Sequence, residues 1–252
     1  MTPRRSTVTL ALGIMIALLA ASFVGPANAV QVRSASAVVK KKTIGHSVKG
    51  RAIKAWQLGN RKDSTTVVIF AAMHGNETAP RTILRTLRDG KKIKGVNLWV
   101  IPVVNPDGVA RHRRVNARGV DLNRNFPINW RKKVGKYSPG KKAASEPETR
   151  AMMRFFRSVK PDYVINLHQP LYGIDTSDSR SPKWAKRLAK NLKLPRKKFR
   201  CGSTCYGTFT QWFNKRQKGT TITVELSRRP SRHYLVKTAP HAILKSIGGR
   251  RS

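Results

Sequence analysis

Acidic residues are scarce in this sequence. Only 11 Asp and Glu stand against 52 Lys and Arg in 252 residues, a formal net charge of +41. Any single basic run is explained by a solvated, self-repelling surface, but the total predicts attraction to a polyanion. For an exported protein, the expected polyanions are anionic cell-wall polymers and membrane surfaces. No helix-turn-helix, zinc-finger or RNA-binding signature is present, so we expect no specific nucleic-acid contact.

Cysteine is also rare. Cys201 and Cys205 are the two cysteines, which excludes a disulfide-dense scaffold and a four-cysteine zinc finger. Their spacing of four residues allows one local disulfide, which we expect to be oxidised outside the cytosol.

Long apolar runs are confined to the N-terminus. Arg4 and Arg5 precede the apolar run 8–24, and Ala27-Asn28-Ala29 follows with the small residues of a cleavage site. The pattern predicts a signal peptide at 1–29 and a secreted or wall-associated protein. The alternative is an uncleaved anchor, for which the run is marginal in length. We expect no transmembrane segment after removal of the signal.

The remaining chain suits one domain with a sizeable core, since 39% of the residues are apolar. We expect a flexible basic lead-in at 30–45, a single domain at 46–247 and a loose basic tail at 248–252.

Short segments rich in Val, Ile and aromatic residues alternate with helical patterns. The predicted strands are 67–73, 97–104, 163–168 and 220–226, and the predicted helices are 78–88, 145–159, 182–192 and 209–216. Ser145 and Glu148 have the spacing of a helix-capping box. This alternation indicates a layered α/β domain with a largely parallel sheet.

Polar residues follow the predicted strands, where ligands of such sheets bind. His74 and Glu77 follow the first strand, and His168 ends the third. Two imidazoles and a carboxylate are good zinc donors. The alternatives are hydrogen-bonded or strand-capping histidines and an ordinary first-turn helix acid.

Glu225 lies within the apolar strand segment 222–226. A carboxylate there needs a partner or a function, because an unpaired buried charge is costly. It is therefore either in a salt bridge to one of the many basic residues or a general base.

The run 105–127 is too specific for a generic basic loop. Its Asn123-Arg124 pair offers an amide and a planar guanidinium, which together match a carboxylate.

Taken in order, these motifs resemble the zinc metallocarboxypeptidases of the carboxypeptidase A class, and most closely the compact bacterial branch that includes murein peptide amidases. The matching pieces are H-G-N-E (74–77), N-P-D-G (105–108), R-V-N-A-R-G-V-D-L-N-R-N-F-P (114–127), S-E-P-E-T-R-A (145–151), L-H-Q-P-L (167–171), G-T-F-T-Q-W-F (207–213) and T-V-E-L (223–226). The resemblance implies a three-layer α/β/α sandwich with a mixed, mostly parallel central sheet.

The resemblance also implies roles for individual residues. One zinc ion would be held by His74, Glu77 and His168, with Glu225 as the general base. Arg114 would polarise the scissile carbonyl; Arg111 and Arg113 are its neighbours in the same basic run.

Asn123 and Arg124 would hold the terminal carboxylate of a peptide substrate. The segment 208–212 would line the specificity pocket, with Thr210 or Gln211 as neutral polar residues there. The absence of an acid in this segment disfavours a dedicated preference for C-terminal Lys or Arg.

Two further residues have open roles. Tyr206 either covers the bound substrate or packs beside the cysteines, and Asp175 either meets a substrate amino group or is a turn acid.

The resemblance therefore predicts a secreted zinc carboxypeptidase or amidase that hydrolyses the C-terminal residue of a peptide. The expected substrate is a peptidoglycan-derived peptide, cleaved at a γ-D-glutamyl-diaminopimelate bond. The alternatives are a carboxypeptidase on ordinary exogenous peptides and a catalytically idle protein of the same fold that binds the cell wall or another polyanion.

Overall fold

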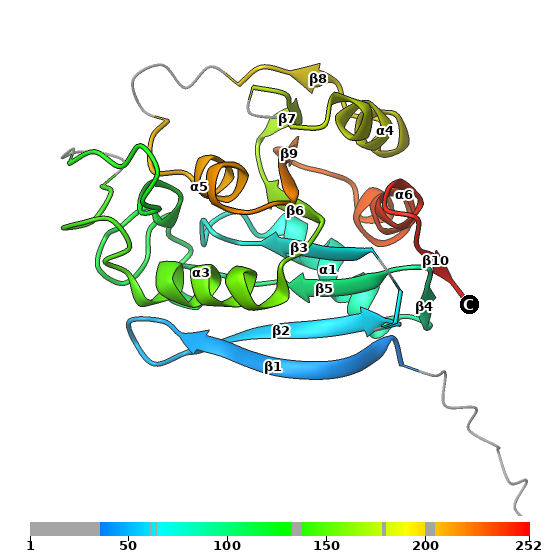
Figure 1. Cartoon of the computed structure of the whole chain (residues 1–252), viewed down its shortest axis with the longest axis horizontal. Helices are drawn as coiled ribbons and strands as arrows, with labels where there is room; N and C mark the ends of the chain where they lie inside the picture. The colour runs from blue at the N-terminus through cyan, green and yellow to red at the C-terminus, as the bar shows by residue number, and fades with distance from the viewer. Residues whose placement is uncertain (1–35, 61, 64, 133–137, 178–179, 200–204) are drawn as a thin grey trace, which may run out of the picture. The chain divides into compact units, whose positions relative to one another are not determined.

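The computed structural model describes residues 36–60, 62–63, 65–132, 138–177, 180–199 and 205–252 (Figure 1). The predicted signal peptide at 1–29 lies outside these residues. The described residues belong to one compact unit. None of its helices combines the length and the apolar character that a membrane crossing requires.

A mixed eight-stranded sheet forms the middle of the fold. Its centre is parallel, because β5, β3, β6 and β9 run in the same direction, whereas β1, β2 and β7 join it in antiparallel pairs. In spatial order the strands are β1 (Val38–His46), β2 (Ala52–Gly59), β5 (Asn97–Ile101), β3 (Thr66–Ala71), β6 (Tyr163–His168), β9 (Thr220–Ser227), β7 (Leu171–Asp175) and β8 (Arg196–Lys197).

Helices cover both faces of this sheet, as Figure 1 shows. The helical segments are α1 (Ala79–Asp89), α2 (Pro106–Ala110), η1 (Leu122–Arg124), α3 (Pro147–Val159), α4 (Pro182–Leu192), α5 (Phe209–Arg216), η3 (Tyr234–Thr238) and α6 (Ala239–Ser246). Two hydrophobic cores result. One contains buried side chains of α1, α4 and α6, and the other contains those of α3 and α5.

Strand β3 shows how the sequence produces these layers. Its side chains alternate between the two faces, so Val67 and Ile69 belong to one core and Val68 and Phe70 to the other. A strand buried on both faces is uniformly apolar, which is the pattern in the sequence. The predicted three-layer α/β/α sandwich with its mixed sheet is confirmed.

The predicted central elements are present with small differences at their ends. The strand at 163–168 and the helices at 182–192 and 209–216 have the predicted bounds. The capping box is wrong, because the N-cap of α3 is Glu146 and makes no side-chain cap. The Glu148 carboxylate instead accepts a hydrogen bond from the Val48 backbone N–H at 3.1 Å.

The flexible lead-in predicted at 30–45 differs from the structure over residues 38–45, which form most of β1 and pair with β2. The error has a physical cause. This edge strand exposes Lys40, Lys41 and Lys42, and exposed lysines protect an edge strand from pairing with other chains while hiding its apolar pattern.

The basic tail predicted at 248–252 is also partly ordered. β10 (Arg250–Arg251) pairs with β4 (Ile93–Lys94) in a second, two-stranded sheet. Of the two cysteines, Cys205 is disulfide-bonded, while Cys201 lies outside the described residues.

Candidate metal centre and active-site cleft

The carboxyl ends of the parallel strands meet at one cleft. His74 and Glu77 follow β3, His168 is the last residue of β6, and Glu225 of β9 is its register partner. A cavity of about 660 Å³ opens there. Its lining includes all seven site residues predicted from the sequence: His74, Glu77, Arg114, Asn123, Arg124, His168 and Glu225.

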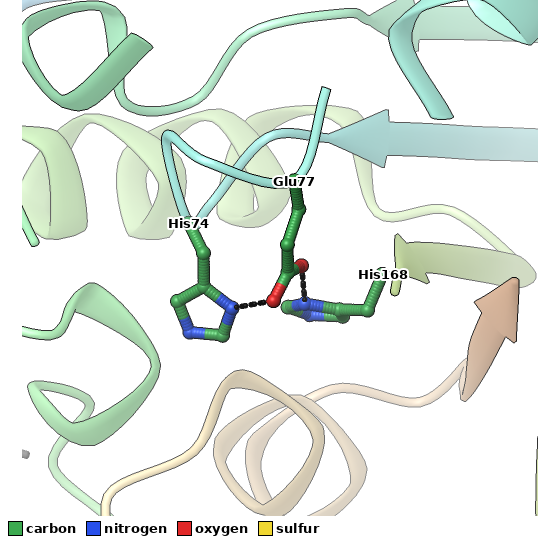
Figure 2. A group of neighbouring side chains, drawn as sticks. All are labelled: His74, Glu77 and His168. Atoms are coloured by element: carbon green, nitrogen blue, oxygen red, sulfur yellow. Dashed lines mark hydrogen bonds and ion pairs between the residues drawn. The ribbon is translucent and has the colours of Figure 1, made fainter. Parts of the chain in front are cut away.

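Three of these side chains form a compact donor cluster. Figure 2 shows the Glu77 carboxylate between two imidazoles: its Oε1 is 2.6 Å from His74 Nδ1 and its Oε2 is 2.7 Å from His168 Nδ1. All three residues are buried, and their ligand atoms lie within 4.8 Å of one another. Among the described residues, nothing pairs with the buried Nε2 of His168. Its ring is therefore oriented by the contact at the donor cluster.

The electrostatics of the cluster fit a metal site. Burial alone would raise the pKa of Glu77, but His74 and His168 outweigh it and hold that pKa well below its usual range. Burial lowers the pKa of His74, but Glu77 and Asp121 outweigh it and raise that pKa to about 9. Two imidazoles and an ionised carboxylate are a known catalytic zinc set, so the residues fit this ion.

Asp121 supports the cluster from behind. Its fully buried carboxylate accepts a hydrogen bond from His74 Nε2 at 3.0 Å and another from Arg114 Nε at 2.9 Å. The carboxylate therefore orients the His74 ring so that Nδ1 points toward the cluster. Sequence reasoning did not single out Asp121, although one acid within a strongly basic run was an available signal.

Of the neighbouring arginines Arg111, Arg113 and Arg114, the structure places Arg114 in the cleft. Its Nη1 is 3.5 Å from Glu77 Oε1 and its Nη2 is 2.9 Å from Asp121 Oδ2. Arg111 instead donates to the Asn116 carbonyl at 2.8 Å, and neither Arg111 nor Arg113 lines the cavity. The catalytic role of Arg114 stays a prediction.

Glu225 lies at the edge of the cluster, half-buried. Its Oε2 accepts a hydrogen bond from the Leu171 N–H at 3.3 Å, and burial raises the pKa of its carboxyl, which His168 partly counteracts. Within the described part of the chain, no Lys or Arg forms an ion pair with it. In so basic a protein, this absence disfavours the salt-bridge alternative.

The short helix η1 presents Asn123 and Arg124 to the cleft. Asn123 Oδ1 accepts a hydrogen bond from the Phe209 N–H at 2.9 Å, so its amide NH₂ group is left as a donor. Arg124 is largely buried, and its Nη1 donates to the Asn123 carbonyl at 2.7 Å. The two residues thus form a small, rigid group of donors suited to a carboxylate.

The part of the cleft wall formed by the start of α5 and by β9 carries neutral polar side chains. Thr210 and Thr223 share a hydrogen bond of 3.0 Å between their hydroxyls. Gln211 also lines the cavity, but its amide NH₂ donates to the Cys205 carbonyl at 3.0 Å. Gln211 also completes a capping box with Thr208 at the start of α5. Thr210 is therefore the better candidate for contact with substrate.

Of the two residues with open roles, Asp175 lines the cleft and Tyr206 does not. The Tyr206 ring packs under the Arg131 guanidinium, 4.9 Å from its centroid, and the residue does not line the cavity. Asp175 does line it. Its Oδ1 accepts from the Ser177 N–H at 2.9 Å, and its Oδ2 has no hydrogen-bond partner among the described residues.

Comparisons with known proteins agree with this geometry. A profile of the zinc carboxypeptidase family matches residues 29–243. Murein peptide amidase A of Escherichia coli K12 is 34% identical over 146 residues, which cover 51% of this chain and 58% of that protein. The namesake from Vibrio campbellii is 32% identical over 176 residues, covering 63% of this chain and 68% of that protein. The match thus spans little more than half of the E. coli relative.

Solved structures show the same fold. The murein-tripeptide amidase of E. coli O157 superposes with a TM-score of 0.68 at 28% identity, over 80% of this chain and 91% of that one. Carboxypeptidase A from Helicoverpa armigera gives a TM-score of 0.63 at 21% identity, covering 83% of this chain and 65% of that one, and supports the fold alone. The profile match, the sheet and the His74–Glu77–His168 cluster lead to one conclusion: this chain belongs to the zinc carboxypeptidase family.

Proposed function

We propose that this protein is a zinc-dependent hydrolase that removes the C-terminal residue of a peptide. One observation carries the proposal: the three buried donors His74, Glu77 and His168 lie in the same cleft as Glu225 and the Asn123–Arg124 pair. A metal site, a general base and a carboxylate receptor within one cavity are what this reaction requires.

The chain's own residues divide the work. Asn123 and Arg124 bind the terminal carboxylate, which fixes the scissile bond within the cleft. A zinc ion held by His74, Glu77 and His168 would supply Lewis acidity toward the scissile carbonyl and the attacking water. Glu225 takes the proton from the attacking water and delivers it to the nitrogen of the leaving amine. Arg114 stabilises the negative charge that develops on the carbonyl oxygen.

The proposed substrate is a peptide derived from peptidoglycan, cleaved at a γ-D-glutamyl-diaminopimelate bond. The relatives that carry the name murein peptide amidase support this choice. The neutral Thr210–Thr223 pair suits a polar side chain, and the Asp175 carboxylate in the same cavity can accept a substrate amino group. We further propose that the protein is exported and stays near the wall, as the predicted signal peptide and the net charge of +41 suggest.

The test is turnover by the zinc-loaded protein of two peptides. One is L-Ala-γ-D-Glu-diaminopimelate and the other is an ordinary peptide with a hydrophobic C-terminal residue. We expect release of diaminopimelate, and we expect Glu225→Gln to lower kcat by about 10²- to 10⁴-fold with zinc still bound. Faster turnover of the ordinary peptide would favour the exogenous-peptide alternative. Zinc binding without turnover of either peptide would favour the idle binding protein.

A further inference from the structure

A second concave surface is strongly cationic and shares no lining residue with the cleft. It is a groove of about 320 Å³ between α1, β2 and the segment 102–110. The groove contains five cationic side chains and, among the described residues that line it, no acid. We call it the basic groove; its cations are Arg51, Lys54, Arg81, Arg85 and Arg88.

Regular secondary structure gathers these charges. Arg81, Arg85 and Arg88 are spaced four and three residues apart, so they lie along one face of α1. Lys54 and Trp56 are two residues apart on β2 and therefore lie on the same face of the sheet. Lys41 of β1 lies opposite Trp56 in the register, so it lies on the same face of the sheet, beside the groove.

Only part of this charge is neutralised within the described chain. Arg51 pairs with Asp107 at 2.6 Å, and Arg88 pairs with Asp89 at 2.5 Å. Lys41, Lys54 and Arg85 are exposed and form no ion pair with any described residue.

The remaining charges repel one another. The pKa of Arg81 is lowered, mainly by partial burial and then by repulsion from the neighbouring Arg85. A bound anion would offset this repulsion.

The residue types indicate which anion. Guanidinium groups pair with phosphate oxygens in a planar, bidentate way, and three of the cations are arginines on one helix. From Arg81 to Arg88 the helix rises about 10 Å, which is long enough for more than one phosphate of a chain.

The position of Trp56 indicates which kind of phosphate chain the groove can bind. The Arg88 guanidinium covers its ring at 4.9 Å, and no other aromatic residue in the described chain lines the groove. A surface for stacking nucleic-acid bases is therefore missing. The groove suits a phosphodiester chain without bases.

We propose that the basic groove binds an anionic phosphodiester polymer of the cell wall, of the poly(glycerol phosphate) type, and so keeps the protein beside its substrate. The choice of a wall polymer rests on the proposed function, but binding to the groove requires no catalysis. Failure of one proposal therefore leaves the other testable.

The test compares two triple variants that remove the same charge. The groove variant carries Lys41→Gln, Lys54→Gln and Arg85→Gln. The control carries Lys183→Gln, Lys186→Gln and Arg187→Gln on α4, which lies beside β7 and β8 at the opposite end of the sheet (Figure 1). All six side chains are exposed.

Affinity for purified poly(glycerol phosphate) is measured by calorimetry at several salt concentrations. The zinc-loaded full chain is used, with thermal melting and turnover of a soluble peptide as checks of the fold.

We expect the groove variant to lose about tenfold or more in affinity at moderate salt, and its salt slope to fall by about 2 because three phosphate contacts are lost. The control should keep most of its affinity, and both variants should melt and turn over a soluble peptide like the parent. Equal losses in the two variants would overturn the proposal. So would a parent protein that does not bind the polymer, or one that binds single-stranded DNA of equal charge more tightly.

Discussion

At the scale of single residues, the candidate metal centre depends on charges that compensate one another. The ionised Glu77 lies between two imidazoles, and Asp121 lies behind one of them. Of these residues, His74, Glu77 and His168 could be predicted because their types and their places after predicted strands suggest zinc. The sequence marks Asp121 as an acid within a strongly basic run, but it does not indicate the role of that acid, because the role depends on a contact with His74, 47 residues distant in sequence.

Asp121→Asn tests this support. The amide keeps the shape of the side chain but no longer offers two ionised acceptors to His74 and Arg114. We expect zinc affinity to fall by about 10- to 100-fold, measured by competition with a chelator. Asp89→Asn, on an exposed carboxylate at the end of α1, is the control and should leave the affinity unchanged. Parent-like zinc affinity in Asp121→Asn would contradict the supporting role.

Zinc binding should depend on pH through His74. Its pKa in the metal-free protein is raised to about 9 by Glu77 and Asp121, so below that pH zinc must displace a proton. We therefore expect affinity to rise by about tenfold per pH unit from 7 toward 9 and to level off above. Calorimetry across this range measures the slope, and a flat profile would contradict the assignment.

The raised pKa of His74 also affects the stability of the metal-free protein, which falls with rising pH whereas zinc affinity rises. A folded-state pKa above the ordinary 6.5 stabilises the fold below pH 6.5, and this contribution is lost as the pH rises through about 9.

At the scale of elements, the site depends on loops braced against one another. The Gly75 N–H donates to the Arg114 carbonyl at 3.3 Å, which ties the loop after β3 to the basic run. Gln169 accepts from the Ala79 N–H at 3.0 Å, which ties the loop after His168 to the start of α1. The central elements could be predicted because buried strands are uniformly apolar. These tie points could not, because they join segments that are distant in sequence.

Gly75→Ala tests the bracing. A Cβ at Gly75 would lie 2.0 Å from the Gly108 carbonyl carbon, so the loop must move away from α2. We expect weaker zinc binding and a lower melting temperature, because His74 and Glu77 flank the displaced segment. Asn76→Ala, at an exposed position in the same loop, should behave like the parent. Parent-like zinc affinity in Gly75→Ala would show that the close approach does not position the ligands.

At the scale of the whole molecule, zinc should stabilise the fold, because the cluster joins the loop after β3 to the end of β6. Zinc at a hundred times its Kd adds about 2.7 kcal/mol to the free energy of unfolding. For a domain of this size we expect a rise in Tm of about 5 to 10 °C, reversed by a chelator. Scanning calorimetry with and without zinc measures it, and an unchanged Tm would contradict a site on the folded chain.

The net charge of the whole molecule shows what amino-acid composition can predict and what it cannot. The total of +41 predicts a polyanion partner but not where it binds, because Lys41 and Arg85 approach one groove only after β1 and α1 have folded. Lys40, Lys41 and Lys42 also led to the prediction of a flexible segment where β1 lies.

The most direct test of the central claim is a crystal structure of the zinc-loaded protein with anomalous data at the zinc absorption edge. The account predicts one anomalous peak per chain, with His74 Nδ1, His168 Nδ1 and the Glu77 carboxylate as its protein ligands. A chain without a peak there, or a peak held by other residues, would contradict it.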